Sequence, residues 1–202
     1  MVISHHKKPL VILLHEIYGV NEQIKYFLKR FIDEGFGVLA PDLLQKEPFP
    51  YEQEEDAYQY FMNQIGFNKS VNKVVQIIQL NRDKYDQVYV VGFSVGATIA
   101  WLSSEYKVDG IVGFYGSRIR DYLEIMPVCP ALLYFAIKEK SFDVYDLEKK
   151  ISNKSNVSVN IVDADHGFMN PFIKTYDSQK STECLRDAIV FLKRIREGTG
   201  IS

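Results

Sequence analysis

The sequence contains little cysteine and no long apolar run. Only two of its 202 residues are cysteine, Cys129 and Cys184, and this spacing fits neither a disulfide framework nor a metal-binding motif. The apolar run at residues 10–14 is too short for the core of a secretory signal, and no segment is long enough to span a bilayer. We therefore expect a cytoplasmic protein with two reduced, mostly buried thiols, no membrane association, and no metal or other cofactor.

The sequence also lacks an excess of charge of either sign. Lys and Arg number 24, Asp and Glu number 26, and the formal net charge is -2. A nearly neutral chain gives no electrostatic reason to bind nucleic acid or an anionic membrane surface, and we expect neither partner. The length predicts a single domain over residues 1–202, with residues 1–8 as a flexible tail. We expect a monomer or a homodimer.

The chain does contain a regular alternation of short apolar runs and helical patterns. The runs predict strands at residues 9–15, 37–40, 89–93, 108–114, 130–136 and 157–162. Between and after them, helical patterns lie at residues 24–32, 71–78, 95–106, 144–151 and 185–195. This alternation is typical of an α/β fold, a three-layer sandwich with a mainly parallel sheet flanked by helices. A functional site is then expected beyond the carboxyl ends of the strands.

Residues 43–66 interrupt this alternation. The segment holds five aromatic side chains among five acidic ones. One interpretation is a solvated acidic helix whose aromatic side faces the core. The other is a cap that covers the site and supplies part of a substrate pocket.

The motif G-F-S-V-G at residues 92–96 follows a β-branched run and precedes a helical pattern. This is the pattern of a nucleophile elbow, in which a strand turns sharply into a helix and presents one serine above the sheet edge. Gly92 and Gly96 would remove the Cβ atoms that otherwise collide in so tight a turn. The motif therefore predicts Ser94 as a nucleophile, and the alternative is a serine that only caps the helix.

A serine nucleophile requires a base, and in this architecture the order along the chain is serine, acid, histidine. His166 follows the last predicted strand in D-A-D-H-G-F, in the loop before the final helix. His5 and His6 lie in the predicted tail, and His15 directly precedes Glu16. Position and order together predict His166 as the base.

The acid is expected after the strand at residues 130–136. Glu139 lies three residues beyond Ala136, and Asp143 lies four residues further, immediately before a helical pattern. An aspartate in that place has an alternative role as a helix N-cap. We favour Glu139 and retain Asp143 as the alternative acid.

An oxyanion hole requires two hydrogen-bond donors. The N–H of Val95, after the nucleophile, is the first candidate, and the N–H of Ile17 in the loop after the first strand is the second. Glu16 is unusual there, because a carboxylate beside an oxyanion hole opposes negative charge. Its side chain either fixes the loop through hydrogen bonds or reorients as the nucleophile becomes active.

Four motifs together resemble the dienelactone hydrolase family: H-E-I-Y-G-V-N at residues 15–21, A-P-D at 40–42, G-F-S-V-G at 92–96, and H-G-F at 166–168 followed by Tyr176-Asp177. The similarity runs from about residue 9 to residue 195. It implies an α/β-hydrolase fold and an ester-cleaving enzyme. It also implies these roles: Ser94 as nucleophile, His166 as base, Glu16 as modulating carboxylate, and Ile17 and Val95 as oxyanion hole.

The chain departs from that family's pattern in three places. The enzyme that names the family has cysteine in the elbow where this chain has Ser94, and the acid is usually aspartate where Glu139 is the nearest candidate. The founding member binds its substrate carboxylate with arginines. This chain has no arginine between Asp42 and Leu80 and has Asn170 four residues after His166. The substrate is therefore not expected to be a dienelactone.

These observations predict a serine hydrolase that cleaves a small ester, lactone or thioester through an acyl-Ser94 intermediate. An alternative is a hydrolase-fold binding or regulatory protein without turnover. A third interpretation is acyl transfer on the same scaffold.

Overall fold

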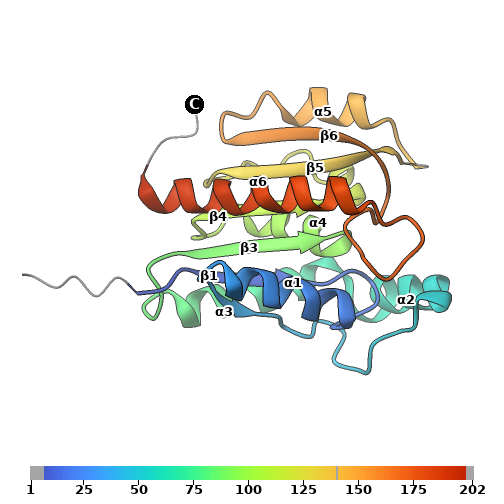
Figure 1. Ribbon diagram of the computed structural model, residues 1–202, viewed down its shortest axis with the longest axis horizontal. Helices are drawn as coiled ribbons and strands as arrows, with labels where there is room; N and C mark the ends of the chain where they lie inside the picture. The colour runs from blue at the N-terminus through green and yellow to red at the C-terminus, as the bar shows by residue number, and fades with distance from the viewer. Residues whose placement is uncertain (1–6, 140, 199–202) are drawn as a thin grey trace, which may run out of the picture.

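The centre of the fold is a six-stranded sheet with strand order β2-β1-β3-β4-β5-β6, in which every neighbouring pair is parallel (Figure 1). The computed structural model describes residues 7–139 and 141–198. The strands are β1 (Leu10–Leu14), β2 (Gly37–Leu39), β3 (Val88–Phe93), β4 (Gly110–Phe114), β5 (Ala131–Lys138) and β6 (Val157–Asp165). The predicted parallel sheet is thus confirmed, and β5 and β6 extend past their apolar runs to Lys138 and Asp165.

Helices connect these strands. They are α1 (Glu22–Asp33), α2 (Glu54–Tyr60), α3 (Gly66–Asn81), α4 (Val95–Ser103), α5 (Val144–Ile151) and α6 (Ser178–Glu197). The Asn21 side chain caps α1 by accepting a hydrogen bond from the N–H of Ile24. The helix after Ser94 ends at Ser103 rather than near residue 106, since the Ser104 side chain bonds back to the Trp101 carbonyl at 2.6 Å.

The alternation of side chains along the strands divides the core into two layers. One set, which includes Ile12, Val90 and Leu133, packs against α3, α4 and α5. The other set, which includes Val11 and Val91, packs against α1 and α6, the two helices that cross in front of the sheet in Figure 1. Because successive residues point to opposite faces of a sheet, an apolar run covered on both sides builds both cores at once. The predicted three-layer sandwich is confirmed.

Residues 43–66 form a short 3₁₀ turn (Tyr51–Gln53), α2, and a π-helical turn (Phe61–Ile65) that ends at Gly66 with φ 71°. The acidic residues of α2 are exposed, whereas Ala57 and Phe61 are buried. This agrees with an acidic helix whose apolar side faces the core. The segment also lies beyond the carboxyl ends of the strands (Figure 1), where a cap would lie.

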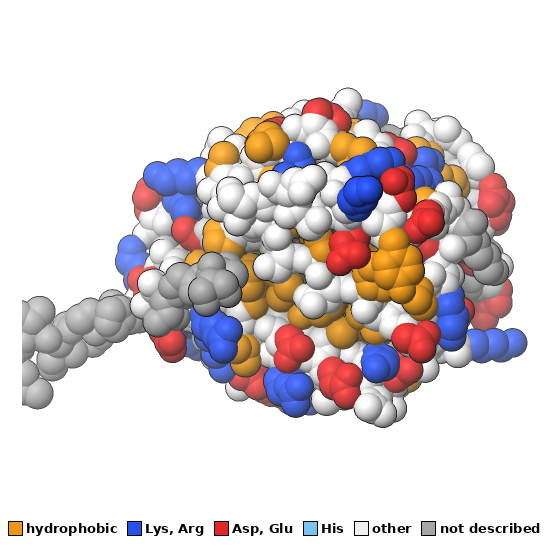
Figure 2. Space-filling view, turned by 90° about the horizontal axis from the view of Figure 1, so that it is seen from above, with side chains coloured by type: hydrophobic (Ala, Val, Ile, Leu, Met, Phe, Trp, Pro, Cys, Tyr) orange, Lys and Arg blue, Asp and Glu red, His pale blue; other side chains and the backbone are white. Residues whose placement is uncertain are grey.

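The structure also bears on the predictions about the tail, the cysteines, the surface charge and membrane association. Residues 1–6 of the predicted tail, with His5 and His6, lie outside the described residues, and Lys7 and Lys8 form backbone hydrogen bonds with Asp86. Cys129 and Cys184 are both buried and free. Lys and Arg side chains alternate with Asp and Glu on the face shown in Figure 2. Within the described residues, no helix combines the length and apolarity needed to cross a membrane.

The strand glycine at the elbow is expected to tolerate no side chain. A Cβ atom on Gly92 would lie 2.1 Å from the carbonyl oxygen of Gly96, which is backbone and cannot move aside. A Cβ on Gly113 would meet the Leu133 side chain at 2.9 Å, which can rotate. We expect Gly92→Ala to prevent folding or to lower the free energy of unfolding by more than about 3 kcal/mol, and Gly113→Ala to cost about 1 kcal/mol. Urea denaturation of both variants measures this, and equal costs would contradict it.

Candidate active site

Ser94 lies at a strained turn between β3 and α4. Its backbone has φ 52° and ψ -115°, a conformation that non-glycine residues rarely adopt and that is typical of functional sites. Gly92 and Gly96 allow this turn, since a Cβ on Gly96 would lie 2.6 Å from the Leu14 carbonyl oxygen. Ser94 occupies the N-cap position of α4, but its side chain makes no capping hydrogen bond. The hydroxyl is therefore available to another partner.

That partner is His166. Its Nε2 lies 3.2 Å from Ser94 Oγ, and its Nδ1 lies 2.7 Å from Glu139 Oε1. The Glu139 side chain is 5% exposed and the imidazole 39% exposed, so the carboxylate is screened from solvent while the imidazole is reached by it. If Glu139 accepts the Nδ1–H, then Nε2 carries the lone pair that can receive the serine proton. The predicted nucleophile, base and acid are thus joined in one continuous chain of hydrogen bonds.

A local irregularity in the sheet brings the acid and the histidine together. Ala136 pairs with Val162 and Lys138 pairs with Asp165, so β6 contains one more residue than β5 between these two pairs. Because Lys138 lies beside Asp165, the residues that follow them, Glu139 and His166, also lie side by side. Bulges of this kind redirect side chains next to active sites.

Asp143, the alternative acid, has another role in the structure. Its Oδ1 accepts hydrogen bonds from the N–H groups of Tyr145 at 2.9 Å and Asp146 at 3.2 Å, and it is the N-cap of α5. This is the capping role that its place before a helical pattern suggests. Of the two candidate acids, the structure brings only Glu139 to His166.

The surroundings of His166 favour the protonated imidazole. Burial alone would lower its pKa, but the hydrogen bond and charge of Glu139, with the charges of Glu16 and Glu54, outweigh burial and raise the pKa above its ordinary value. The base is therefore stronger than a free imidazole.

The two predicted oxyanion donors lie beside the elbow. The close contact between Gly96 and the carbonyl oxygens of Leu14 and His15 packs the first turn of α4 against the end of β1, so the loop that carries Ile17 starts next to Ser94. Both Ile17 and Val95 are buried. Within the described part of the chain, neither backbone N–H has a hydrogen-bond acceptor, which leaves both free for a ligand oxygen.

Glu16 is held in a buried network of hydrogen bonds. Its Oε1 accepts from the Tyr115 hydroxyl at 2.7 Å and from Gln23 Nε2 at 3.2 Å, and its Oε2 accepts from Asn170 Nδ2 at 3.4 Å. Burial raises the pKa of Glu16, although these donors and His166 act in the opposite direction. The network is the arrangement expected of a side chain that fixes its loop. No hydrogen bond joins Glu16 to Ser94 among the described residues.

Sequence reasoning missed the donors of this network. Tyr115 follows β4 at the same sheet edge as the other site residues, has φ 44°, and places its ring centroid 4.9 Å from that of His166. Gln23 is fully buried on α1 and lies one residue before the predicted helical pattern begins. The one usable signal was the place of Tyr115 directly after a predicted strand.

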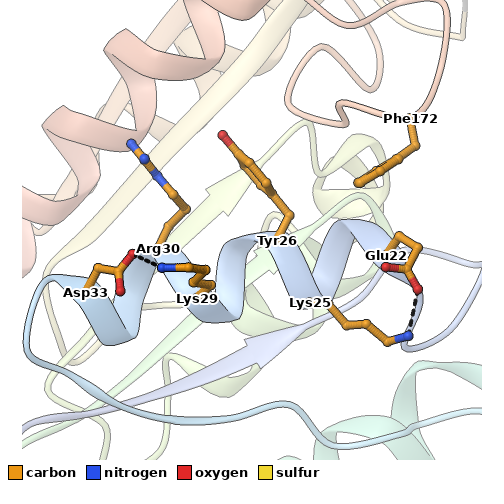
Figure 3. A pocket seen from close by; sticks show the side chains of 7 residues that line it. All are labelled: Glu22, Lys25, Tyr26, Lys29, Arg30, Asp33 and Phe172. Carbon is orange, nitrogen blue, oxygen red and sulfur yellow. Dashed lines mark hydrogen bonds and ion pairs between the residues drawn. The ribbon is translucent and has the colours of Figure 1, made fainter.

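A separate open cleft of about 450 Å³ lies elsewhere on the surface. It is formed by the outer face of α1 and Phe172 from the loop before α6, and Figure 3 shows two ion pairs along its rim. None of the predicted site residues lines it. Among the described residues, no three His, Cys, Asp or Glu side chains are grouped closely enough to hold a metal ion.

A family model described as the dienelactone hydrolase family matches residues 2–196. The chain belongs to the dienelactone hydrolase family. The resemblance seen in the motifs is thus confirmed, together with the predicted enzyme class, a hydrolase.

The relatives agree with this membership. The chain is 45% identical over 168 residues to the uncharacterized protein YczH of Bacillus subtilis. This alignment covers 81% of this chain and 82% of the relative. The chain is 21% identical over 192 residues to carboxymethylenebutenolidase 1 of Cupriavidus pinatubonensis, covering 86% and 81% of the two chains. A crystal structure of a putative dienelactone hydrolase from Klebsiella pneumoniae superposes with a TM-score of 0.80 at 19% identity, over 93% of this chain and 87% of that one. This likeness confirms the α/β-hydrolase fold.

The two candidate acids are expected to differ in their effect on His166. Glu139→Gln removes the negative charge and leaves only a neutral amide oxygen as acceptor for the Nδ1–H, so the pKa of His166 should fall toward or below its ordinary value. Asp143→Asn should leave the pKa of His166 unchanged and should change stability little, because asparagine caps a helix about as well as aspartate. NMR titration of the imidazole in both variants measures this, and a lowered pKa in Asp143→Asn alone would reverse the assignment.

Proposed function

We propose that this chain is a serine hydrolase that cleaves a small ester, lactone or thioester through an acyl-Ser94 intermediate. The observation that carries the proposal is the hydrogen-bonded chain from Ser94 through His166 to Glu139. Nucleophile, base and orienting acid within hydrogen-bond reach are the recognised geometry for activating a hydroxyl. Family membership supports the same reaction class, since the relatives include carboxymethylenebutenolidases.

The geometry supports a two-step mechanism. His166 Nε2 takes the proton of Ser94 as its oxygen attacks the substrate carbonyl, and the same nitrogen then protonates the leaving group. The N–H groups of Ile17 and Val95 would stabilise the negative oxygen of the tetrahedral intermediate. Water, activated by His166, hydrolyses the acyl-enzyme. Because only the neutral imidazole accepts the proton, hydrolysis should fall as the pH drops through the raised pKa of His166.

The segment at residues 43–66 is suited to be the cap of this site. Tyr51 packs edge-on against Tyr18 with ring centroids 4.8 Å apart, and its hydroxyl contacts Asn21 and Asn170. Tyr58 accepts a hydrogen bond from Arg118, which follows β4. These contacts attach the segment to the loops that surround Ser94. We infer that its aromatic side chains form part of the substrate pocket.

Asn170 stands four residues after His166, where an arginine that binds a substrate carboxylate would be expected from the founding member of the family. Its amide is fully buried and bonds Glu16 and Tyr51, while Arg118 bonds Asp121 and Tyr58. Glu16, Glu54 and Glu139 all raise the pKa of His166 through their charge, so the surroundings of the base are anionic. We infer that the substrate carries no negative charge near the scissile bond.

Ser94 is expected to react with a fluorophosphonate probe. An activated serine should give one covalent adduct per chain, located at Ser94 by peptide mass spectrometry, and Ser94→Ala should give none. A control is Ser104→Ala, which removes a buried serine whose hydroxyl bonds only backbone and should label normally. A native chain that stays unlabelled while control hydrolases react would contradict the nucleophile and favour a binding protein without turnover.

A negative charge on the substrate is expected to lower kcat/KM. In matched pairs of p-nitrophenyl esters that differ by a terminal carboxylate, the uncharged ester should be cleaved at least about tenfold faster, since like charges in a partly buried site repel by more than about 1.4 kcal/mol. Steady-state kinetics at low and high salt measure this. A preference for the charged member would contradict the inference about the substrate without affecting the proposed nucleophile.

A further inference from the structure

His15 is a buried histidine that the proposed mechanism does not use. It directly follows β1 and is 1% exposed. Its Nδ1 lies 2.5 Å from the carbonyl oxygen of Glu16, and its Nε2 lies 3.0 Å from the backbone nitrogen of Leu43. Both ring nitrogens are therefore engaged with backbone groups of two different loops.

These contacts determine the protonation state of the ring. The Leu43 N–H can only donate, so Nε2 accepts and carries no proton. The Glu16 carbonyl can only accept, so Nδ1 carries the proton and donates it. His15 is thus a neutral imidazole of one tautomer, and burial, which lowers its pKa, agrees with this state.

The carbonyl that His15 binds belongs to the same peptide unit as the N–H of Ile17. Among the described residues no peptide bond is cis, and in a planar trans peptide the C=O and N–H point in opposite directions. A donor that fixes the Glu16 carbonyl therefore also fixes the direction of the Ile17 N–H. The Gly19 N–H, at 3.4 Å, is a second and weaker donor to the same oxygen.

The other contact of His15 anchors the ring itself. Leu43 lies in the loop after β2, which is held by Asp42: its Oδ1 accepts from the N–H groups of Leu44 and Gln45 at 2.9 and 3.0 Å, and its carbonyl accepts from Lys73. The imidazole is thus oriented by a loop that is itself rigidly bonded. This is the arrangement that preorganises a donor before charge develops.

We propose that His15 is a positioning residue, whose neutral imidazole holds the Glu16–Ile17 peptide so that the Ile17 N–H faces the carbonyl oxygen of the bound substrate. The inference rests on the proposed function, because it assumes that this N–H serves as an oxyanion donor. His15 touches neither substrate nor Ser94, and it acts only through the peptide that it orients.

The test compares an ester with the matching thionoester, in which sulfur replaces the carbonyl oxygen. Sulfur accepts hydrogen bonds weakly, so the rate ratio of ester to thionoester reports the oxyanion hole itself. Loss of one oxyanion donor costs about 10²–10³ in kcat. For His15→Leu, which removes both hydrogen bonds, we expect kcat for the ester to fall about 10- to 100-fold, the thionoester to lose less, and KM to change little.

Two variants complete the series. His15→Gln offers an amide donor and an amide acceptor and is expected to restore most of the rate ratio. If His15→Leu does not fold, His15→Asn serves in its place, since its shorter amide cannot reach both partners and its ratio should fall. Asp109→Asn is the control, because this carboxylate bonds Arg82 and Val88 at the opposite edge of the sheet, and its loss should lower stability without changing the ratio.

The outcomes separate this inference from the proposed function. A rate ratio that falls in His15→Leu or His15→Asn and recovers in His15→Gln supports it. If these variants keep the wild-type ratio, or if both substrates slow by the same factor, His15 has only a structural role, and acylation of Ser94 in the wild type still supports the hydrolase. A wild-type chain that forms no acyl-Ser94 overturns both.

Discussion

The site depends on how closely three backbone segments approach one another at Ser94. The end of β1, the end of β3 and the first turn of α4 meet where Gly92 and Gly96 leave no side chain between them. Any larger residue would separate the helix from the strands, and with it the N–H of Val95 from the loop that carries Ile17. This close approach requires the strained positive φ of Ser94. The buried strands on either side of β3 hold the backbone in that conformation.

A network of hydrogen bonds accommodates the Glu16 carboxylate beside the peptide N–H of Ile17, the proposed oxyanion donor. Glu16 is buried, and in place of water it accepts hydrogen bonds from Tyr115, Gln23 and Asn170, which lie in three separate segments of the chain. A buried charge with one missing partner is expensive, whereas a satisfied one makes the surrounding loops rigid. Glu16 therefore ties the loops after β1, β4 and β6 into one unit around the histidine.

The fold was largely predictable because the apolar runs, the helical spacing and the elbow glycines are local signals. The proximity of Ser94 and His166 was predictable for a related reason, since each directly follows a strand pattern. The choice between Glu139 and Asp143 was not settled by sequence, because it depends on how far β5 extends beyond its predicted run, through Ile137 to Lys138. Tyr115 was missed because its partner Glu16 is 99 residues away in the chain, and local patterns carry no information on such contacts. Gln23 was missed because it lies outside the predicted helical pattern.

The extra residue in β6 determines which position along the chain can supply a carboxylate to His166. Strands inside a sheet cannot gain a residue without disturbing neighbours on both sides, but β6 has a paired neighbour on one side only. An extra residue in this outermost strand therefore disturbs only its pairing with β5 and leaves the elbow at the end of β3 unchanged. In this protein the extra residue brings His166 into register with Glu139, which directly follows β5. With a regular pairing between β5 and β6, Glu139 and His166 would be one residue out of register, and an acid for the histidine would have to come from a different position along the chain.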